Sequence, residues 1–317
     1  MVDVSLPFPY PAPHGRTSRR LEWAHLPPFV RDVVEDRIGT HVLQAQSQTS
    51  GFTPGFASVL AGADGTRHFV KAASVKAQRM FAESYREEAR KLGGLPEGVP
   101  APRLLWTHDA DDWVVLGIEH VEARAPHRPW NGSDLDACLQ MLARTAELLT
   151  PPPDDLELDS FATEFGTWPV YWDALCAEGV PHAEEARDLA ARFVGVTAGS
   201  TLVHTDVRDD NILIRADGSA LMCDWNWPVL GAAWLDSLFL LIGPRGDGVD
   251  VETVLATHPT FADVPAESID IVLALIIGYF FHAATEPVPT TSPHIRAHQR
   301  WQGDVLWHWL GERRGWA

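Results

Sequence analysis

The sequence predicts an α+β protein, with a smaller β-rich N-terminal part and a larger, mostly helical C-terminal part. Two observations support this prediction. Up to residue 118, short apolar segments separated by Gly-containing turns indicate strands and hairpins, with one long amphipathic helix between them. Beyond residue 123 the apolar residues mostly follow helical spacing, except in Thr201–Asn226, where strands and a hairpin return.

Composition restricts the class of protein. The chain has 317 residues, enough for one large domain or two lobes with sizeable cores, and its 45% hydrophobic and 21% charged residues are typical of a soluble globular protein. The net charge of −18, from 25 Lys+Arg and 43 Asp+Glu, argues against a nucleic-acid partner, which would need a basic surface. That charge is compatible with a cationic substrate, although acidic residues more commonly serve solubility. The widely spaced cysteines indicate reduced thiols in a cytoplasmic protein: Cys138, Cys176 and Cys223.

Two segments bear on targeting. Residues 1–15 are rich in proline and predict an extended arm. In the same region, prolines stand where a signal peptide would need an apolar run. The most apolar segment, residues 269–284, contains Asp270 and is shorter than the ~20 residues of a spanning helix. We expect this segment to form a buried core helix, and we expect no membrane partner.

The N-terminal lobe is predicted to contain hairpins around one paired helix. Its elements, in order, are a helix at 28–38, a strand at 41–48, a loop at 50–55, a hairpin at 56–73, a helix at 74–92, and a hairpin whose second strand is 113–123. A loop between two such strands can cover phosphates through its backbone N–H groups, which makes Ser50 and Gly51 candidate ligand contacts. An ordinary hairpin loop is the alternative, because the loop glycines do not form a GxGxxG pattern.

A buried charge is predicted in the helix at 74–92. Glu88 follows helical spacing with Tyr85 and Leu92, so it interrupts an apolar stripe, whereas Glu87 points elsewhere. A carboxylate on a buried face needs a partner, since an uncompensated buried charge is costly. The end of the preceding strand offers Lys71. A solvated lysine is the usual alternative for a strand end.

The C-terminal lobe is predicted to be mainly helical. An amphipathic helix at 134–149 follows Ser133, a candidate N-cap. The acidic, tryptophan-rich segment 151–185 is either part of an acceptor site or a solvated helical insertion. The later predicted helices are 231–242, 251–256, 269–284 and 295–313.

The segment Thr201–Asn226 predicts a strand, an acidic loop and a hairpin. Asp217-Gly218 is the favoured pair for a two-residue type I′ turn, because both positions need positive φ. Counting outward from this turn pairs Asn211 with Asp224, and directly opposed residues lie roughly 5 Å apart at Cβ. An amide oxygen and a carboxylate placed side by side suit a hard divalent cation.

The motif His204-x-Asp206-x4-Asn211, followed by the hairpin and Asp224-Trp225-Asn226, resembles the aminoglycoside phosphotransferase family of kinase-like small-molecule phosphotransferases. His-Thr-Asp stands where protein kinases have His-Arg-Asp, and Asp-Trp-Asn where they have Asp-Phe-Gly. The resemblance implies a bilobal protein-kinase-like fold with an N-lobe at 16–118, a hinge at 119–122 and a C-lobe at 123–317.

The resemblance also implies which residues form the site. They are Asp206 and Arg208 as catalytic residues, Asn211 and Asp224 as Mg²⁺ ligands, and Lys71, Glu88, Ser50, Gly51, Glu119 and Val121 as residues that bind ATP or GTP. Arg208 would reach the transferring phosphate, and a salt bridge with Asp209 or Asp210 is the equal alternative. His204 and Asp236 would brace the catalytic loop.

The implied function is transfer of the γ-phosphate of ATP or GTP to a hydroxyl of a small molecule. The acceptor is an antibiotic, such as an aminoglycoside or a nucleoside antibiotic, or a metabolite, and the sequence does not choose between them. Two other classes of protein remain open. One is a non-catalytic nucleotide-binding kinase relative. The other is a divalent-metal hydrolase that uses His204, Asp206, Asp209, Asp210 and Asp224.

Overall fold

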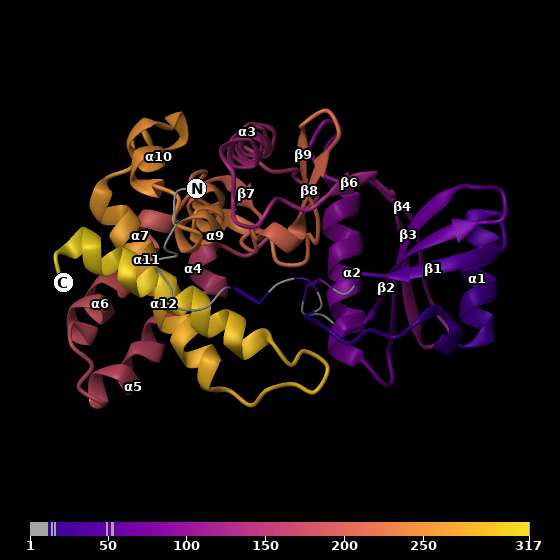
Figure 1. Ribbon diagram of the computed structural model, residues 1–317, viewed down its shortest axis with the longest axis horizontal. Coiled ribbons are helices and arrows are strands. Elements are labelled where there is room, and N and C mark those ends of the chain that lie inside the picture. Colours follow the sequence, from indigo (N-terminus) through magenta and orange to yellow (C-terminus); the bar gives the residue numbers. More distant parts are fainter. Residues whose placement is uncertain (1–11, 14, 16, 49, 52–53, 317) are drawn as a thin grey trace, which may run out of the picture.

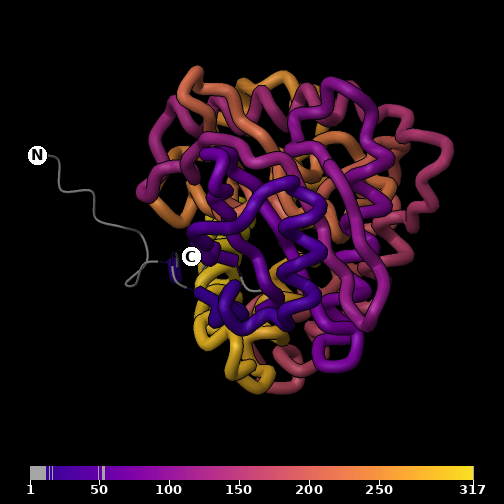
Figure 2. The backbone as a smooth tube through the Cα atoms, turned by 90° about the vertical axis from the view of Figure 1, so that its right-hand side faces the viewer, coloured from indigo at the N-terminus to yellow at the C-terminus, as the bar shows by residue number. Residues whose placement is uncertain are grey.

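The computed structural model describes residues 12–316 except 14, 16, 49 and 52–53. Most of the predicted arm at 1–15 therefore lies outside the described residues. Figure 1 shows two lobes. One is a sheet with a helix on each face, and the other is mainly helical. This arrangement confirms the predicted α+β bilobal fold. Figure 2 views the molecule from the end of the sheet lobe, with the helical lobe behind it.

The N-terminal lobe is a five-stranded antiparallel sheet in the order β1-β2-β3-β5-β4. Two of its hairpins turn tightly, β2–β3 at Gly65 (φ 85°) and β4–β5 at Asp111-Asp112 (φ 53° and 65°), while α2 connects β3 to β4. Its elements are α1 (Pro28–Ile38), β1 (Val42–Ser47), β2 (Phe56–Gly62), β3 (Arg67–Ser74), α2 (Arg79–Gly93), β4 (Leu104–Ala110) and β5 (Trp113–Ile118), preceded by the short helix η1 (Trp23–His25).

Two helices cover the two faces of this sheet (Figure 1). Helix α1 buries Val30 and Val34 against the outer face, and Gly39 ends it in the left-handed conformation at φ 74°. Helix α2 lies on the other face, toward the C-terminal lobe, and buries Tyr85 and Glu88. The predicted helical phase is therefore confirmed.

The C-terminal lobe consists of helices around two small sheets, one of β7 and β10 and one of β6, β8 and β9. Its strands are β6 (Ala123–Arg124), β7 (Thr201–Val203), β8 (Ile212–Arg215), β9 (Ala220–Met222) and β10 (Val229–Gly231). Its helices are α3 (Gly132–Leu148), α4 (Phe161–Glu164), η2 (Trp168–Tyr171), α5 (Trp172–Ala177), α6 (Ala183–Ala190), α7 (Phe193–Thr197), η3 (Asp209–Asn211), α8 (Leu235–Leu240), α9 (Ile242–Gly246), α10 (Val251–Thr257), η4 (Pro259–Phe261), α11 (Ala266–Thr285) and α12 (Ile295–Arg314).

Helix α11 is the core helix predicted at 269–284. By length and composition it is the one helix among the described residues that could cross a membrane, and 61% of its most apolar window is buried inside the protein. It packs against α12 and α6. Its acidic residue Asp270 accepts a hydrogen bond of 2.6 Å from Arg313 of α12, which compensates the buried charge.

In the N-terminal lobe, the helix predicted at 74–92 begins at Arg79, and the strand predicted at 113–123 ends at Ile118. Three details of the C-terminal lobe also differ from the sequence-based expectation. Helix α3 is capped by Asn131 rather than Ser133, because the Asn131 side chain accepts from the Asp134 N–H at 2.8 Å. The predicted helix at 231–242 is divided: β10 ends at Gly231, and separate helices begin at Leu235 and Ile242. The third difference is the register of the β8–β9 hairpin, which affects the site.

The β8–β9 hairpin has a three-residue loop instead of the predicted two-residue turn. The N–H of Gly218 donates to the Arg215 carbonyl, and Gly218 has φ 85°. This is a type I turn followed by a left-handed glycine, an arrangement that an Asp-Gly pair also supports. Ile212 therefore pairs with Met222, not with Cys223. The register is shifted by one residue, so the predicted pairing of Asn211 with Asp224 is wrong.

Candidate active site

A cavity of about 1220 Å³ lies between the two lobes. It is lined by strands and helix α2 of the N-terminal lobe and by the loops around β7–β9 of the C-terminal lobe. Every residue of the predicted site lines it: Ser50, Gly51, Lys71, Glu88, Glu119, Val121, Asp206, Arg208, Asn211 and Asp224. The fold thus brings together side chains that are far apart in the sequence.

Lys71 is a buried cation of this cavity that binds two carboxylates. Strand β3 places it opposite α2, where its Nζ donates to both carboxylate oxygens of Glu88 at 2.7 and 2.8 Å. Glu88 is 1% exposed, whereas the neighbouring Glu87 faces outward and pairs with Arg90. The predicted contact is present, with the predicted residue buried. Lys71 also donates to Asp224 of the other lobe at 2.6 Å.

Burial and charge act against each other in this cluster. Burial alone would lower the pKa of Lys71, but the carboxylates of Asp224 and Glu88 outweigh it and raise that pKa above its ordinary value. Burial also opposes ionisation of Asp224, yet the charge and hydrogen bond of Lys71 lower its pKa to about 2. Glu88 is more deeply buried, and burial raises its pKa to about 7 despite Lys71. The lysine therefore stabilises Asp224 as an anion more fully than Glu88.

Asp236 binds the backbone at the start of the catalytic loop, residues 204–210. This buried carboxylate accepts from the N–H groups of His204 and Thr205 at 2.7 and 2.9 Å. The Nε2–H of His204 donates a hydrogen bond of 2.8 Å to the Cys223 carbonyl, so His204 links the loop to the end of the hairpin. Thr205 is held at φ 67°, an unusual conformation for a β-branched residue. The bracing roles expected of His204 and Asp236 agree with these contacts.

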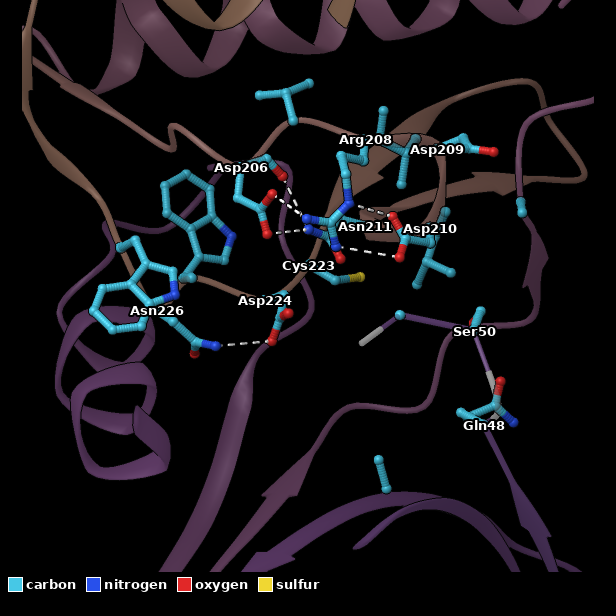
Figure 3. Close-up of a pocket in the computed structure, with 18 of the residues that line it drawn as sticks. Gln48, Ser50, Asp206, Arg208, Asp209, Asp210, Asn211, Cys223, Asp224 and Asn226 are labelled. Atoms are coloured by element: carbon cyan, nitrogen blue, oxygen red, sulfur yellow. Dashed lines mark hydrogen bonds and ion pairs between the residues drawn. The ribbon is translucent and has the colours of Figure 1, made fainter. Parts of the chain in front are cut away.

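Arg208 joins the two acidic ends of the catalytic loop, as Figure 3 shows. Its guanidinium donates to both oxygens of Asp210 at 2.8 and 3.2 Å, and it also hydrogen-bonds Asp206. Asp209 points away from it and pairs with Arg128 at 3.4 Å. The alternative of a salt bridge is therefore present for Asp210, while Arg208 still lines the cavity beside Asp206.

Asn211 and Asp224 both line the cavity despite the shifted register. The Asn211 amide nitrogen donates to the Asp206 carbonyl and carboxylate at 2.9 and 3.0 Å, which directs its amide oxygen away from them. Asp224 follows the end of β9 at φ 67° and turns its carboxylate toward Lys71. Both residues offer hard oxygen donors, which fit Mg²⁺. Among the described residues no group of three His, Cys, Asp or Glu side chains could hold a metal by itself.

The remaining predicted residues lie at the sheet end of the cavity. The carbonyls of Ser50 and Gly51 accept hydrogen bonds from the segment that precedes α1. Glu119 and Val121 belong to the connection between β5 and β6. The N–H of Glu119 already donates to the Arg103 carbonyl at 2.8 Å, so this N–H is not available to a purine.

The cavity also contains residues that the sequence did not single out. The half of the cavity formed by the C-terminal lobe has an aromatic wall. The ring centroids of Phe165 and Trp168 lie 4.5 Å apart, and the Trp168 ring stacks on that of Tyr279 with their centroids 4.1 Å apart. Burial raises the pKa of Tyr279, and the nearby Asp206 raises it further. The tryptophan-rich composition of 151–185 was a signal for part of this wall. Arg20 also lines the cavity, and nothing in its local sequence indicated this.

Comparisons with known proteins agree with this geometry at the level of the fold. No protein-family model and no curated protein matches the sequence. A thermostable mutant of an aminoglycoside phosphotransferase, in ternary complex with ADP and hygromycin B, has a TM-score of 0.61 at 12% identity, covering 89% of this chain and 97% of that chain. Choline kinase from Streptococcus pneumoniae has a TM-score of 0.57 at 16% identity, covering 88% of this chain and 99% of that chain.

A third similar structure is the AMP-bound complex of a spectinomycin phosphotransferase, with a TM-score of 0.57 at 11% identity, covering 88% of this chain and 96% of that chain. The chain thus has the fold of the kinase-like small-molecule phosphotransferases. More particularly, it shares that fold with aminoglycoside phosphotransferases and choline kinase, which confirms at the level of the fold the resemblance that the motif predicted.

Proposed function

We propose that this protein is a nucleotide-dependent O-phosphotransferase that transfers the γ-phosphate of ATP or GTP to a hydroxyl of a small molecule. The observation that carries the proposal is the meeting of Lys71, Glu88 and Asp224 across the two lobes, 2.6 to 2.8 Å apart, in a cavity that also contains Asp206 and Asn211. Phosphoryl transfer needs mainly positioning and charge neutralisation, and these side chains can supply both.

Each side chain has a distinct task in this proposal. Lys71, oriented by Glu88, holds the α/β-phosphates. Asp206 accepts or orients the proton of the acceptor hydroxyl, and Asn211 keeps that carboxylate in place through its 3.0 Å hydrogen bond. Arg208 lies beside Asp206 and neutralises charge on the transferring phosphate. Asn211 and Asp224 would hold Mg²⁺, which supplies further charge neutralisation at the phosphate oxygens.

The nucleotide base belongs at the sheet end of the cavity. We propose residues 119–122 as the hinge between an N-lobe at 16–118 and a C-lobe at 123–317, with Glu119 and Val121 beside the purine. Both residues line the cavity, as do Ser50 and Gly51. This placement leaves the aromatic half of the cavity for the acceptor.

The acceptor half supports a small hydroxylated molecule with an apolar face. Its wall includes Phe165, Trp168, Tyr279 and the 54% exposed Trp227. The Trp227 carbonyl accepts from Thr205 at 3.0 Å, which ties this part of the wall to the catalytic loop. Aromatic faces bind apolar rings and organic cations alike. Antibiotics and metabolites that contain an apolar ring or an organic cation are therefore candidate acceptors. With an antibiotic as acceptor, the protein would be a cytoplasmic resistance enzyme.

The metal-hydrolase alternative receives less support. It requires His204 and the aspartates of the catalytic loop to converge on one metal. Instead, Asp210 is paired with Arg208, Asp209 with Arg128, and His204 with a backbone carbonyl. The alternative also leaves Lys71 and Glu88 without a role. The other alternative, a non-catalytic relative, is disfavoured because Lys71, Asp206, Asn211 and Asp224 are all present in one cavity.

Nucleotide binding and turnover test the proposal. ATP or GTP with Mg²⁺ should raise the melting temperature, because a ligand that binds the folded state stabilises it by mass action. Release of ADP or GDP should then be screened with aminoglycosides, nucleosides, amino alcohols and sugars as acceptors. The absence of both a thermal shift and calorimetric heat at millimolar nucleotide would contradict the proposal, and hydrolysis of a phosphoester without nucleotide would favour the metal hydrolase.

A further inference from the structure

The described residues that precede α1 extend from the C-terminal lobe to the N-terminal lobe (Figure 1). Ala12 is 5% exposed and belongs to the core that includes most of the C-terminal lobe, and burial lowers the pKa of His298 of α12 while the nearby backbone of Pro13 opposes this effect. The N–H of Arg19 donates at 2.8 Å to the carbonyl of Thr291, in the connection between α11 and α12. These contacts anchor the segment to the helical lobe.

The same segment holds the loop between β1 and β2. The Thr17 hydroxyl, in a residue only 3% exposed, donates to the Gly51 carbonyl at 2.6 Å. The Arg20 guanidinium donates to the carbonyls of Ser50 at 3.0 Å and Gly55 at 3.4 Å. Three carbonyls of one loop are thus bound by two side chains that come from outside the sheet.

The loop between β1 and β2 lies close to Asp210 of the catalytic loop. Gly51 has φ 79°, and a Cβ built on it would lie 3.3 Å from Arg20 Nη2 and 3.6 Å from the carboxylate of Asp210. Because a trans peptide points its N–H opposite its C=O, fixing the Ser50 carbonyl also fixes the direction of the Gly51 N–H. The contacts of Thr17 and Arg20 therefore determine how this loop presents its backbone to the cavity.

Arg20 is also a charge of the site. It lines the cavity with Lys71, and its charge lowers the pKa of the nearby Tyr85 and Glu88, in opposition to their burial. A guanidinium beside a lysine and a loop of backbone N–H groups favours an anionic ligand with several oxygens.

We infer that the described residues of the segment 12–20 are part of the nucleotide site, in which Thr17 and Arg20 position the Ser50–Gly51 loop over the polyphosphate of the nucleotide. This inference rests on the proposed function. Thr17 and Arg20 are positioning residues, and Arg20 adds positive charge at the phosphate end. The contacts of Ala12, Pro13 and Arg19 keep the segment on the C-terminal lobe, so the loop is fixed relative to both lobes.

Calorimetric titration of three variants tests the inference. Thr17→Val keeps the shape of the side chain and removes its hydroxyl, Arg20→Gln removes the guanidinium, and Arg19→Gln is the matched control because Arg19 is exposed and contributes through its backbone. We expect Mg²⁺–ATP to bind about 3- to 10-fold more weakly to Thr17→Val and roughly 10- to 100-fold more weakly to Arg20→Gln. Arg19→Gln should bind as the wild type does.

Adenosine, measured by displacement, separates positioning of the phosphates from a general effect on the cleft. Its affinity should change less than about 2-fold in every variant, which corresponds to less than about 0.4 kcal/mol. Arg20→Lys, which keeps the charge, should fall between wild type and Arg20→Gln. Equal losses for ATP and adenosine, or unchanged ATP affinity in folded variants, would overturn the inference alone. A wild-type protein that binds no nucleotide would overturn the proposed function and this inference with it.

Discussion

The ammonium group of Lys71 lies 2.6 Å from the carboxylate of Asp224, 153 residues further along the chain and in the other lobe. Lys71 is at the same time bound by Glu88. The cation therefore connects helix α2, strand β3 and the end of the β8–β9 hairpin. Since Asp224 is held as an anion with a pKa of about 2, the cavity has an ionised carboxylate at this point at neutral pH.

Asp224→Ala should remove the magnesium-dependent part of the nucleotide-induced thermal shift. The substitution deletes a hard oxygen donor and one partner of Lys71. Melting curves with ATP in the presence and absence of Mg²⁺ would measure the effect. Asp217→Asn is a control, since Asp217 lies in the turn of the same hairpin and does not line the cavity. A full magnesium response in Asp224→Ala would exclude this residue as a metal ligand.

Asp206→Asn should lower kcat by about 10²- to 10⁴-fold, the range typical of a positioned general base. Nucleotide affinity should change little, because the lost interaction belongs to the transition state. Steady-state kinetics with the true acceptor and calorimetry with nucleotide would give the two quantities. Turnover near that of the wild type would remove Asp206 from the mechanism, and loss of nucleotide binding would instead make it a metal ligand.

Glu88→Gln should change the pH dependence of stability. Burial raises the pKa of Glu88 from 4.5 to about 7 in the folded protein. The contribution of Glu88 to the free energy of unfolding is therefore fully present below pH 4.5 and is lost as the pH rises through about 7. Relative to Glu88→Gln, the wild type should lose up to about 3 kcal/mol of unfolding free energy between pH 4.5 and pH 8. Urea unfolding at several pH values would measure this difference.

Glu87→Gln is the matched control for that experiment. The neighbouring Glu87 is exposed, and its hydrogen bond with Arg90 lowers its pKa. Its contribution therefore has the opposite sign: it is present above the ordinary pKa of a glutamate and is lost as the pH falls. If the unfolding free energies of the Glu88→Gln and Glu87→Gln proteins depend on pH in the same way, burial does not raise the pKa of Glu88.

Asp236→Ala should destabilise the protein and impair turnover together. Two buried N–H groups of the catalytic loop, those of His204 and Thr205, would lose a charged acceptor. Hydrogen bonds to charged groups contribute about 1.5–3 kcal/mol each, so a loss of roughly 3 kcal/mol or more in unfolding free energy is expected. Urea unfolding would measure it. Asp236→Asn keeps one acceptor oxygen and should lie between, and a variant as stable as the wild type would contradict the bracing role.

Much of the site could be predicted from local sequence because helices and motifs are local. The 3.6-residue period places Glu88, and not Glu87, on the buried face of α2, and the structure agrees. The same reasoning identified α11 as a core helix. The spacing of His204, Asp206 and Asn211 within one loop needs no long-range information. These features depend on residues close in the chain, whose relative directions are set by backbone geometry.

The register of the β8–β9 hairpin shows where local reasoning reaches its limit. An Asp-Gly pair supports both a two-residue turn and a three-residue loop, and these alternatives differ by one residue in every pairing. The protein adopts the longer loop, with Gly218 in the left-handed position. Even so, Asp224 reaches Lys71, because the chain leaves the strand at Met222 and turns at Asp224 itself.

Hydrophobic period and motifs of fixed spacing were enough to predict the α+β fold class, the loop that contains His204, Asp206 and Asn211, and the buried face of α2. The partner that each charge takes became apparent only in the folded chain. Arg208 binds Asp210 and Asp206 rather than Asp209, and Arg20 lines the cavity. Such pairings depend on how distant segments pack, since a charged side chain takes the partners that burial brings within a few ångströms of it.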